Sequence, residues 1–193
     1  MGNDETFLRL SKSEAKSYGK VMHKKWKHRL TKSERLSLIK YKGFFVFSNY
    51  KLINSALRKN KEERYQNDIA NISRAVYKST IDKDIECIRN SSVQFLEDNG
   101  FTAETVSVND ILVEKGFMST YLFKPNLRYS AKIILIIRVH KGTHGAYINN
   151  ILPLSGNKSE YEMLFNKNTK LKVLEKRRYK KRLELVVEML QDE

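Results

Sequence analysis

The residues best suited to chemistry in this 193-residue chain are two glutamates, Glu160 and Glu162, which flank Tyr161. If the segment is a strand, the side-chain period of two places both carboxylates on one face, where like charges are costly to hold together. The chain carries a formal net charge of +15, so cations are abundant. Either a positive group therefore lies opposite the two carboxylates, or they take part in a reaction.

Two other segments carry groups that suit a reaction. Arg89 follows the alternating segment 84–88 and is therefore expected at the end of a strand, where its planar guanidinium suits phosphate. Ser119 and Thr120 begin a predicted strand after the turn at Gly116. Taken singly, such an arginine is more often part of a surface ion pair, and such hydroxyls are usually structural. Only their combination with the glutamates indicates a site.

The first part of the chain has the periodicity of amphipathic helices. Thr31 and Glu34 form a capping-box signature, and the helix that they begin is expected to end at Gly43. Apolar residues recur every three or four positions elsewhere in this part. The further helices are expected over about 11–29, 48–60 and 62–79.

From about residue 84 the pattern changes to short segments rich in β-branched and aromatic residues. Helices followed by strands indicate an α+β domain rather than a parallel βαβ array. We expect one domain over 1–193, with a helical part over about 1–80 and a β core over 81–193. Segments 91–100 and 105–116 look helical or loop-like. The strands are expected within 84–90, 117–123, 131–140, 145–151, 161–165, 169–176 and 182–190.

Basic residues concentrate in two regions of the sequence. Residues 1–42 contain twelve Lys and Arg against four acids, and residues 167–182 contain nine against Glu175 alone. This balance favours a polyanionic partner, namely nucleic acid, an anionic membrane, a phosphate-bearing cofactor or an acidic protein surface. The segment 176–182 contains Tyr179 as its only aromatic residue, so the interleaved aromatic pattern of nucleic-acid binding is weak there.

Several classes of structure are excluded. A single cysteine, Cys87, forms no intramolecular disulfide and builds no Cys-rich metal site. The four histidines have no metal-ligand spacing, and we expect no metal. No apolar run reaches the roughly 20 residues that span a bilayer, so no membrane insertion is expected. The N-terminus lacks the apolar region of a secretory signal.

In order and spacing, Arg89, Ser119 and Glu162 resemble the arginine, serine, glutamate signature of the bacterial mono-ADP-ribosyltransferase toxins. The chain is most similar to single-domain exoenzymes that modify Rho proteins and to the catalytic domains of binary toxins that modify actin. The resemblance covers roughly residues 12–175. Its further segments are "INSALR" at 53–58, "FMST" at 117–120, "KGTHGAYI" at 141–148 and "SEYEMLF" at 159–165.

The resemblance implies roles for five residues. Glu162 matches the catalytic glutamate, which holds the nicotinamide-ribose hydroxyl of NAD and offsets the developing positive charge. Ser119 matches the serine that orients this glutamate. Arg89 matches the arginine that supports the site and contacts phosphate. Asn54 and Arg58 match helix residues that contact NAD, and their spacing of four places them on one helix face.

Glu160 matches a position that is usually glutamate in relatives that modify arginine, where it receives the target guanidinium; relatives that modify asparagine have glutamine there. Further matches are looser. Tyr129 and Lys132 match an aromatic residue near nicotinamide and a phosphate-binding cation, although a core role for Tyr129 is an equal alternative. Tyr121 replaces the third residue of the usual Ser-Thr-Ser element. In the matching substrate-recognition loop, Leu154 replaces an exposed aromatic residue.

The resemblance implies a fold in which the helical part packs on two mainly antiparallel β-sheets, with NAD in the cleft between them. The implied activity is transfer of ADP-ribose from NAD to an arginine of a host protein, either actin or a Rho-type GTPase. The resemblance further implies a secreted monomer that acts in the host cytosol, with a separate translocation component or unaided entry. The alternatives are a nucleic-acid-binding protein and a degenerate family member that only hydrolyses NAD.

Overall fold

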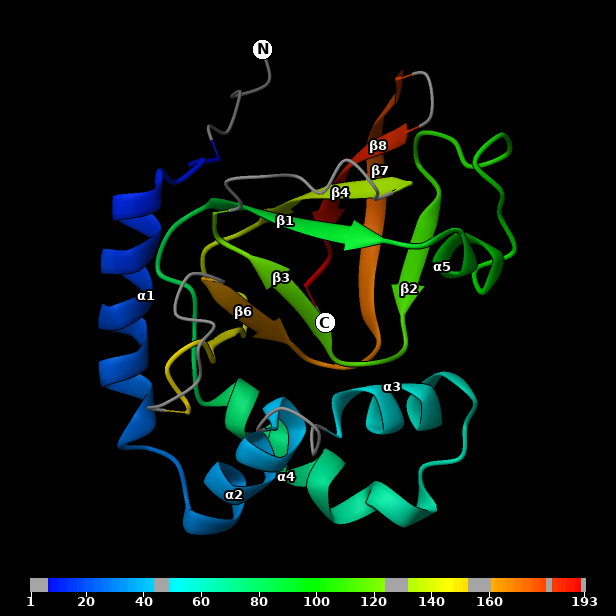
Figure 1. Ribbon diagram of the computed structural model, residues 1–193. Coiled ribbons are helices and arrows are strands. Elements are labelled where there is room, and N and C mark those ends of the chain that lie inside the picture. Colours follow the sequence, from blue (N-terminus) through cyan, green and yellow to red (C-terminus); the bar gives the residue numbers. More distant parts are fainter. Residues whose placement is uncertain (1–6, 44–48, 124–131, 153–160, 180–181, 192–193) are drawn as a thin grey trace.

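The computed structural model describes residues 7–43, 49–123, 132–152, 161–179 and 182–191. Helices dominate the first part of the chain and strands the rest, which confirms the predicted α+β class (Figure 1). None of the described helices is both long and apolar enough to cross a membrane. The helices are α1 (Lys12–Lys27), α2 (Lys32–Lys42), α3 (Tyr50–Arg58), the 3₁₀ turn η1 (Glu63–Tyr65), α4 (Gln66–Tyr77) and α5 (Val93–Glu97).

Capping residues define where the first two helices begin. Thr31 accepts a hydrogen bond from the backbone N–H of Glu34, and the Glu34 carboxylate accepts one from the backbone N–H of Thr31, which confirms the predicted capping box. Ser11 and Glu14 form the same arrangement at α1. Each box satisfies backbone donors that a helix start leaves unpaired, so these sequences fix where the helices start. Gly43 ends α2 with φ +68°, a conformation that favours glycine.

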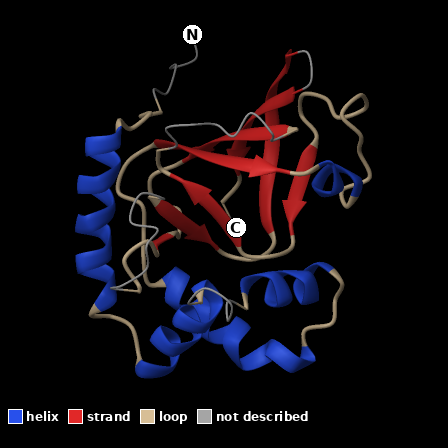
Figure 2. Cartoon of the chain, in the orientation of Figure 1, coloured by secondary structure: helices blue, strands red, loops and turns tan. Residues whose placement is uncertain are grey.

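The eight strands form one hydrogen-bonded sheet in the order β2-β7-β8-β4-β1-β3-β6-β5, drawn in red in Figure 2. The pair β4 and β8 is parallel and the other pairs are antiparallel. The strands are β1 (Ile85–Ser91), β2 (Ile111–Glu114), β3 (Met118–Tyr121), β4 (Ile133–Val139), β5 (Ala146–Tyr147), β6 (Glu162–Phe165), β7 (Thr169–Tyr179) and β8 (Arg182–Met189).

The expectation of two mainly antiparallel sheets is not confirmed, because the described strands join into one sheet. Strand β1 pairs along its full length with β4, and it also pairs with β3, which joins the two halves of the sheet. The second pairing is short, because its only partners in register are Ile88 and Tyr121. The group β3-β6-β5 is therefore attached to the larger group through one narrow join, across which the Arg89 side chain of β1 donates to the backbone oxygen of Ser119 in β3.

Strand β2 was also mispredicted, since the sequence indicated helix or loop over 105–116. Residues 111–114 pair with β7 instead. Four residues are too short a segment for period-two alternation to stand out. The pairing is driven by burial of Leu112 and places Glu114 inside the protein.

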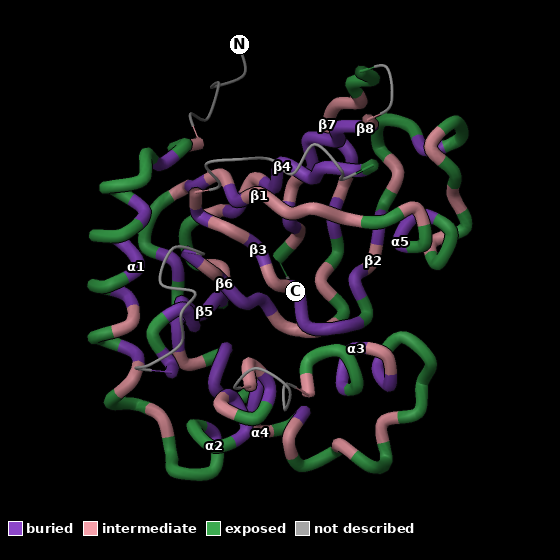
Figure 3. Tube along the Cα trace, viewed as in Figure 1, coloured by how far each residue is buried: buried purple, intermediate pink, exposed green. Residues whose placement is uncertain are grey.

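Two buried clusters account for the packing of helices on the sheet (Figure 3). In the first, α1 packs on β5 and contributes residues such as Ala15 and Met22 to a core that both groups of strands share. In the second, α2, α3 and α4 pack against β5 and β6 around Trp26, Phe117 and Leu164. The start of β6 and the middle of β3 therefore face α2 and α3, and this is where the polar residues gather.

Candidate active site

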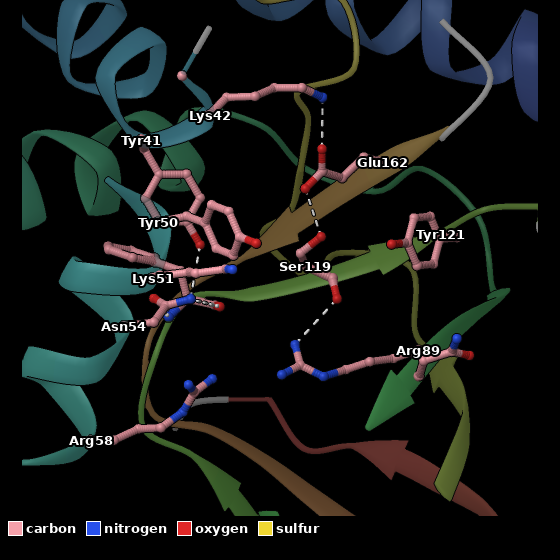
Figure 4. Close-up of a pocket in the computed structure, with 13 residues that line it drawn as sticks. Tyr41, Lys42, Tyr50, Lys51, Asn54, Arg58, Arg89, Ser119, Tyr121 and Glu162 are labelled. Carbon is pink, nitrogen blue, oxygen red and sulfur yellow. Dashed lines mark hydrogen bonds and ion pairs between the residues drawn. The ribbon is translucent and has the colours of Figure 1, made fainter. Parts of the chain in front are cut away.

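Glu162 is the first residue of β6 and lies next to Ser119 of the neighbouring strand β3 (Figure 4). The Ser119 Oγ donates a hydrogen bond to Glu162 Oε1 at 2.6 Å. Tyr161, immediately before, has φ +48° and lies outside the strand, so period-two alternation begins at Glu162. Glu160 lies outside the described residues, and the described strand begins at Glu162.

Lys42, which the sequence analysis missed, holds the other oxygen of Glu162. Its Nζ donates to Glu162 Oε2 at 2.7 Å from the last residue of α2. The two side chains are only 9% and 13% exposed, so solvent screens this ion pair weakly. Each oxygen of the Glu162 carboxylate therefore has its own donor. A lysine in the last turn of a helix is so common that its sequence position carried no signal.

Arg89 lies within β1 rather than at its end, two residues earlier than a strand-end position. Its NH1 donates to the backbone oxygen of Ser119 at 3.2 Å, and its NH2 pairs with Glu114 Oε2 at 2.5 Å. Burial lowers the pKa of Arg89, while the neighbouring Glu114 opposes that shift. Among the described residues, the buried Arg89 Nε has no hydrogen-bond partner. Arg89 thus supports the backbone of Ser119 and keeps one donor unused.

Glu114 links Arg89 to Arg58 and was not predicted. Arg58 of α3 donates from Nε to Glu114 Oε1 at 3.0 Å and from NH2 to Oε2 at 3.1 Å, which is the bidentate geometry of a strong pair. The Gly116 N–H also donates to Oε1 at 2.9 Å. The Glu114 side chain is 2% exposed. A buried carboxylate therefore orients both arginines.

Asn54 of α3 is engaged by the protein itself. Its Nδ2 donates to the Tyr41 hydroxyl at 3.1 Å and to the Phe117 oxygen at 3.2 Å, and its Oδ1 accepts from the Phe117 N–H at 3.0 Å. The Asn54 amide clamps the segment that leads into Ser119. Gly116 leaves room for this amide, because a Cβ there would lie 3.0 Å from the Asn54 Oδ1.

These groups border one cavity of about 530 Å³, whose volume is typical of small-molecule sites. Among the described residues, its charged lining consists of the Glu162 carboxylate and four cations, namely Lys42, Lys51, Arg58 and Arg89. A ligand with phosphates and a separate positive centre fits this charge distribution. The rest of the described lining is Tyr41, Gly43, Tyr50, Asn54, Asn90, Phe117, Ser119 and Tyr121.

The remaining sequence-predicted residues are placed as follows. Tyr121 lies on the same face of β3 as Ser119 and lines the cavity, while the Ser119 hydroxyl keeps its bond to Glu162. Lys132 is exposed just before β4, and the described lining of the cavity does not include it. Tyr129 and Leu154 lie outside the described residues. Within the described part of the chain, no group of three or more metal-ligating side chains is present.

The sequence of this chain matches the family model for the ADP-ribosyltransferase exoenzyme over residues 15–192. This chain belongs to the ADP-ribosyltransferase exoenzyme family. The match confirms the resemblance from which the site residues were taken. The enzymes of this family are NAD-dependent transferases. A search of curated protein sequences gave no match.

Solved structures of other proteins share the exoenzyme fold. Plx2a, an ADP-ribosyltransferase toxin from Paenibacillus larvae, is 21% identical with a TM-score of 0.80, covering 96% of this chain and 99% of its own. The Clostridium limosum C3 exoenzyme is 19% identical with a TM-score of 0.78, covering 97% and 98%. C3stau2 from S. aureus, solved with NAD, is 18% identical with a TM-score of 0.77, covering 98% and 100%. At these identities the likeness shows the fold alone.

The contact between Lys42 and Glu162 leads to a stability prediction. Lys42→Met keeps the aliphatic stem but leaves the weakly exposed Glu162 carboxylate without its cation, which should lower the free energy of unfolding by about 1–3 kcal/mol. Urea denaturation measures this loss. Lys40→Met, on the same helix but half-exposed, is the matched control and should stay within about 0.5 kcal/mol.

A double-mutant cycle completes this test. Lys42→Met combined with Glu162→Gln should be less destabilised than the sum of the two single variants, because the lost ion pair is then counted once. Strict additivity would show that Lys42 and Glu162 do not interact.

Proposed function

We propose that this exoenzyme transfers ADP-ribose from NAD to an arginine of a host protein and releases nicotinamide. The observation that carries the proposal is the 2.6 Å hydrogen bond between Ser119 and Glu162 at the edge of a cavity whose other charged residues, among those described, are cations. NAD combines a pyrophosphate with a positively charged nicotinamide ribose. The cations suit the pyrophosphate, and the Glu162 carboxylate suits the nicotinamide ribose.

In the proposed reaction, the bond between the nicotinamide nitrogen and the ribose C1′ breaks, and its electron pair leaves with nicotinamide. The ribose becomes an oxocarbenium-like cation, and Glu162 offsets its charge while accepting a hydrogen bond from a ribose hydroxyl. Ser119 holds the carboxylate in place, so little reorganisation accompanies the charge development. An arginine nitrogen of the target then bonds to C1′.

Phosphate binding falls to the arginines and Lys51. Arg58 and Arg89 are both oriented by Glu114, so their remaining N–H groups are directed before NAD arrives. The buried Arg89 Nε is a donor without a partner among the described residues, and a phosphate oxygen would accept its hydrogen bond. Lys51 lines the same cavity from about two turns before Arg58 on α3.

The arginine target is proposed from Glu160. Arginine is protonated at every accessible pH, and its attack on C1′ requires loss of a proton. A carboxylate at position 160 receives the guanidinium and takes that proton, a role that glutamine cannot fill. The host protein is actin or a Rho-type GTPase, in line with the relatives named by the family resemblance. The proposal includes secretion and action in the host cytosol, with entry unaided or through a separate component.

The nucleic-acid alternative was based on the net charge and on the basic segment 176–182, which begins in β7. Arg177 pairs with Glu175 and Glu184, and Arg178 pairs with Glu104. These contacts tie the arginines to neighbouring carboxylates and favour the structural interpretation of this strand.

Labelled NAD incubated with a eukaryotic lysate tests the proposal. We expect wild type to label a discrete protein through a bond that neutral hydroxylamine cleaves, as an arginine linkage requires. Labelling that resists hydroxylamine would contradict the arginine target. If wild type neither labels a protein nor releases nicotinamide, the proposed activity is wrong.

Glu160→Gln separates the two halves of the reaction. The variant should lose protein labelling by at least about 100-fold, because the acceptor carboxylate is gone, while releasing nicotinamide within about threefold of wild type. Both rates are measured on the same preparation. Glu160→Asp, which keeps the charge, is the control and should retain part of the labelling. Equal loss of both rates in Glu160→Gln would show that Glu160 acts on NAD instead.

A further inference from the structure

The exposed face of α1 carries four lysines in register. Lys12, Lys16, Lys20 and Lys24 are each four residues apart, so they form one stripe about 18 Å long. All four are exposed, and none forms an ion pair with any residue that the structure describes. The only acid on α1, Glu14, is engaged by the Ser11 cap. The positive charge of the stripe is therefore directed at solvent.

The buried face of α1, which adjoins the stripe, holds the helix in a fixed rotation. Gly19 packs so closely on the Tyr147 ring that a Cβ would lie 2.2 Å from it. The His23 Nδ1 lies 3.2 Å from the backbone oxygen of Tyr147, and Tyr18 and Ala15 are buried in the core. Because the helix cannot turn, the direction of the lysine stripe relative to the sheet is set.

The stripe borders the segment that leads to the catalytic glutamate. Lys16 and Lys20 line a cavity of about 320 Å³ together with Asn149, Asn150 and Tyr161. Tyr161 directly precedes Glu162 in the chain. None of the described residues around this cavity lines the larger cavity assigned to NAD. NAD bound in that larger cavity therefore leaves the stripe uncovered and open to a second partner.

We propose that the α1 lysine stripe docks an acidic surface of the protein substrate and brings its target residue to Glu162. This proposal rests on the proposed transferase activity. An unpaired row of positive charge attracts a complementary acidic surface, steers its approach and fixes its orientation. The exposed side chain of Asn150, at the edge of the stripe, adds a neutral hydrogen-bonding group to the same surface.

Charge reversal in the middle of the stripe tests docking separately from catalysis. Lys16→Glu combined with Lys20→Glu should lower the initial rate of lysate-protein labelling at least 10-fold at 50 mM salt. Raising the salt to 200 mM should lower the labelling rate of wild type more steeply than that of the variant. Nicotinamide release from NAD and transfer to agmatine, a small guanidine, should stay within twofold of wild type. These two rates measure the proposed transferase activity without a protein substrate, so a failure of that activity is distinguished from a failure of docking.

The matched control reverses two exposed lysines away from α1. Lys61→Glu combined with Lys170→Glu makes the same change in net charge, and neither lysine forms an ion pair with a described residue. This control should label protein within twofold of wild type. Equal loss in both double variants would show a net-charge effect and overturn the proposal. Unchanged labelling by the stripe variant would also overturn the proposal. If the stripe variant no longer sediments with phosphatidylserine vesicles but still labels protein, the stripe binds a membrane instead.

Discussion

Glu162→Gln should lower kcat for nicotinamide release by roughly 10²–10³-fold, the loss seen when one electrostatic contact to a developing charge is removed. Glutamine keeps the size of the side chain and its hydrogen bond with Ser119, but it has no negative charge to offset the ribose cation. The NAD dissociation constant should change by no more than about threefold, because the cations proposed to bind the phosphates are untouched. Steady-state release of nicotinamide and calorimetric titration with NAD measure the two quantities.

Ser119→Ala is the comparison for this variant. It removes the 2.6 Å hydrogen bond but leaves the Glu162 charge, so kcat should fall by only about 10-fold. The order of the two effects distinguishes a catalytic group from the group that positions it. A Glu162→Gln variant with kcat within fivefold of wild type would show that this carboxylate does not stabilise the reaction.

Glu114→Ala should lower the free energy of unfolding by about 3–5 kcal/mol, as expected when one partner of a buried ion pair is removed. The carboxylate is 2% exposed and accepts hydrogen bonds from Arg58, Arg89 and the Gly116 N–H. Without it, the buried Arg89 guanidinium faces the positive charge of Arg58 with no counter-ion. Urea denaturation measures the loss, and NAD affinity should fall with it because the two arginines are no longer oriented.

Arg58→Ala is the matched control, since it leaves the pair of Arg89 and Glu114 intact. The Arg58 side chain is 37% exposed, so its removal should cost about 1 kcal/mol, well below the cost of losing Glu114. If the two variants had the same stability, the buried carboxylate would not be the group that holds the arginines.

Local sequence signals predicted the helical part of the fold. The capping box of Thr31 and Glu34 fixed the start of α2, and apolar periodicity placed α4, where Ile69, Ile72 and Val76 are buried. These signals depend on neighbours within one or two helix turns, so a single sequence contains them. The strands with five or more apolar residues, such as β4 and β8, were found for the same reason.

Contacts between distant segments were the part that the sequence did not reveal. Glu114 is buried because the short strand β2 pairs with β7, and nothing in its neighbourhood distinguishes it from a surface glutamate. Lys42 reaches Glu162 across 120 residues of chain. The single sheet likewise depends on the narrow pairing of β1 with β3. The pairing of Ser119 with Glu162 was expected only because the family resemblance supplied it.

The release of nicotinamide from NAD by the purified chain tests the central claim most directly. The cavity with Glu162 at its edge should hold NAD and break its nicotinamide bond even without a protein target, because the groups assigned to that step all belong to this chain. We predict that wild type liberates nicotinamide and ADP-ribose in equal amounts, while Glu162→Gln binds NAD but liberates neither at a comparable rate. Wild type that binds NAD without cleaving it, or cleavage that survives in Glu162→Gln, would contradict the account.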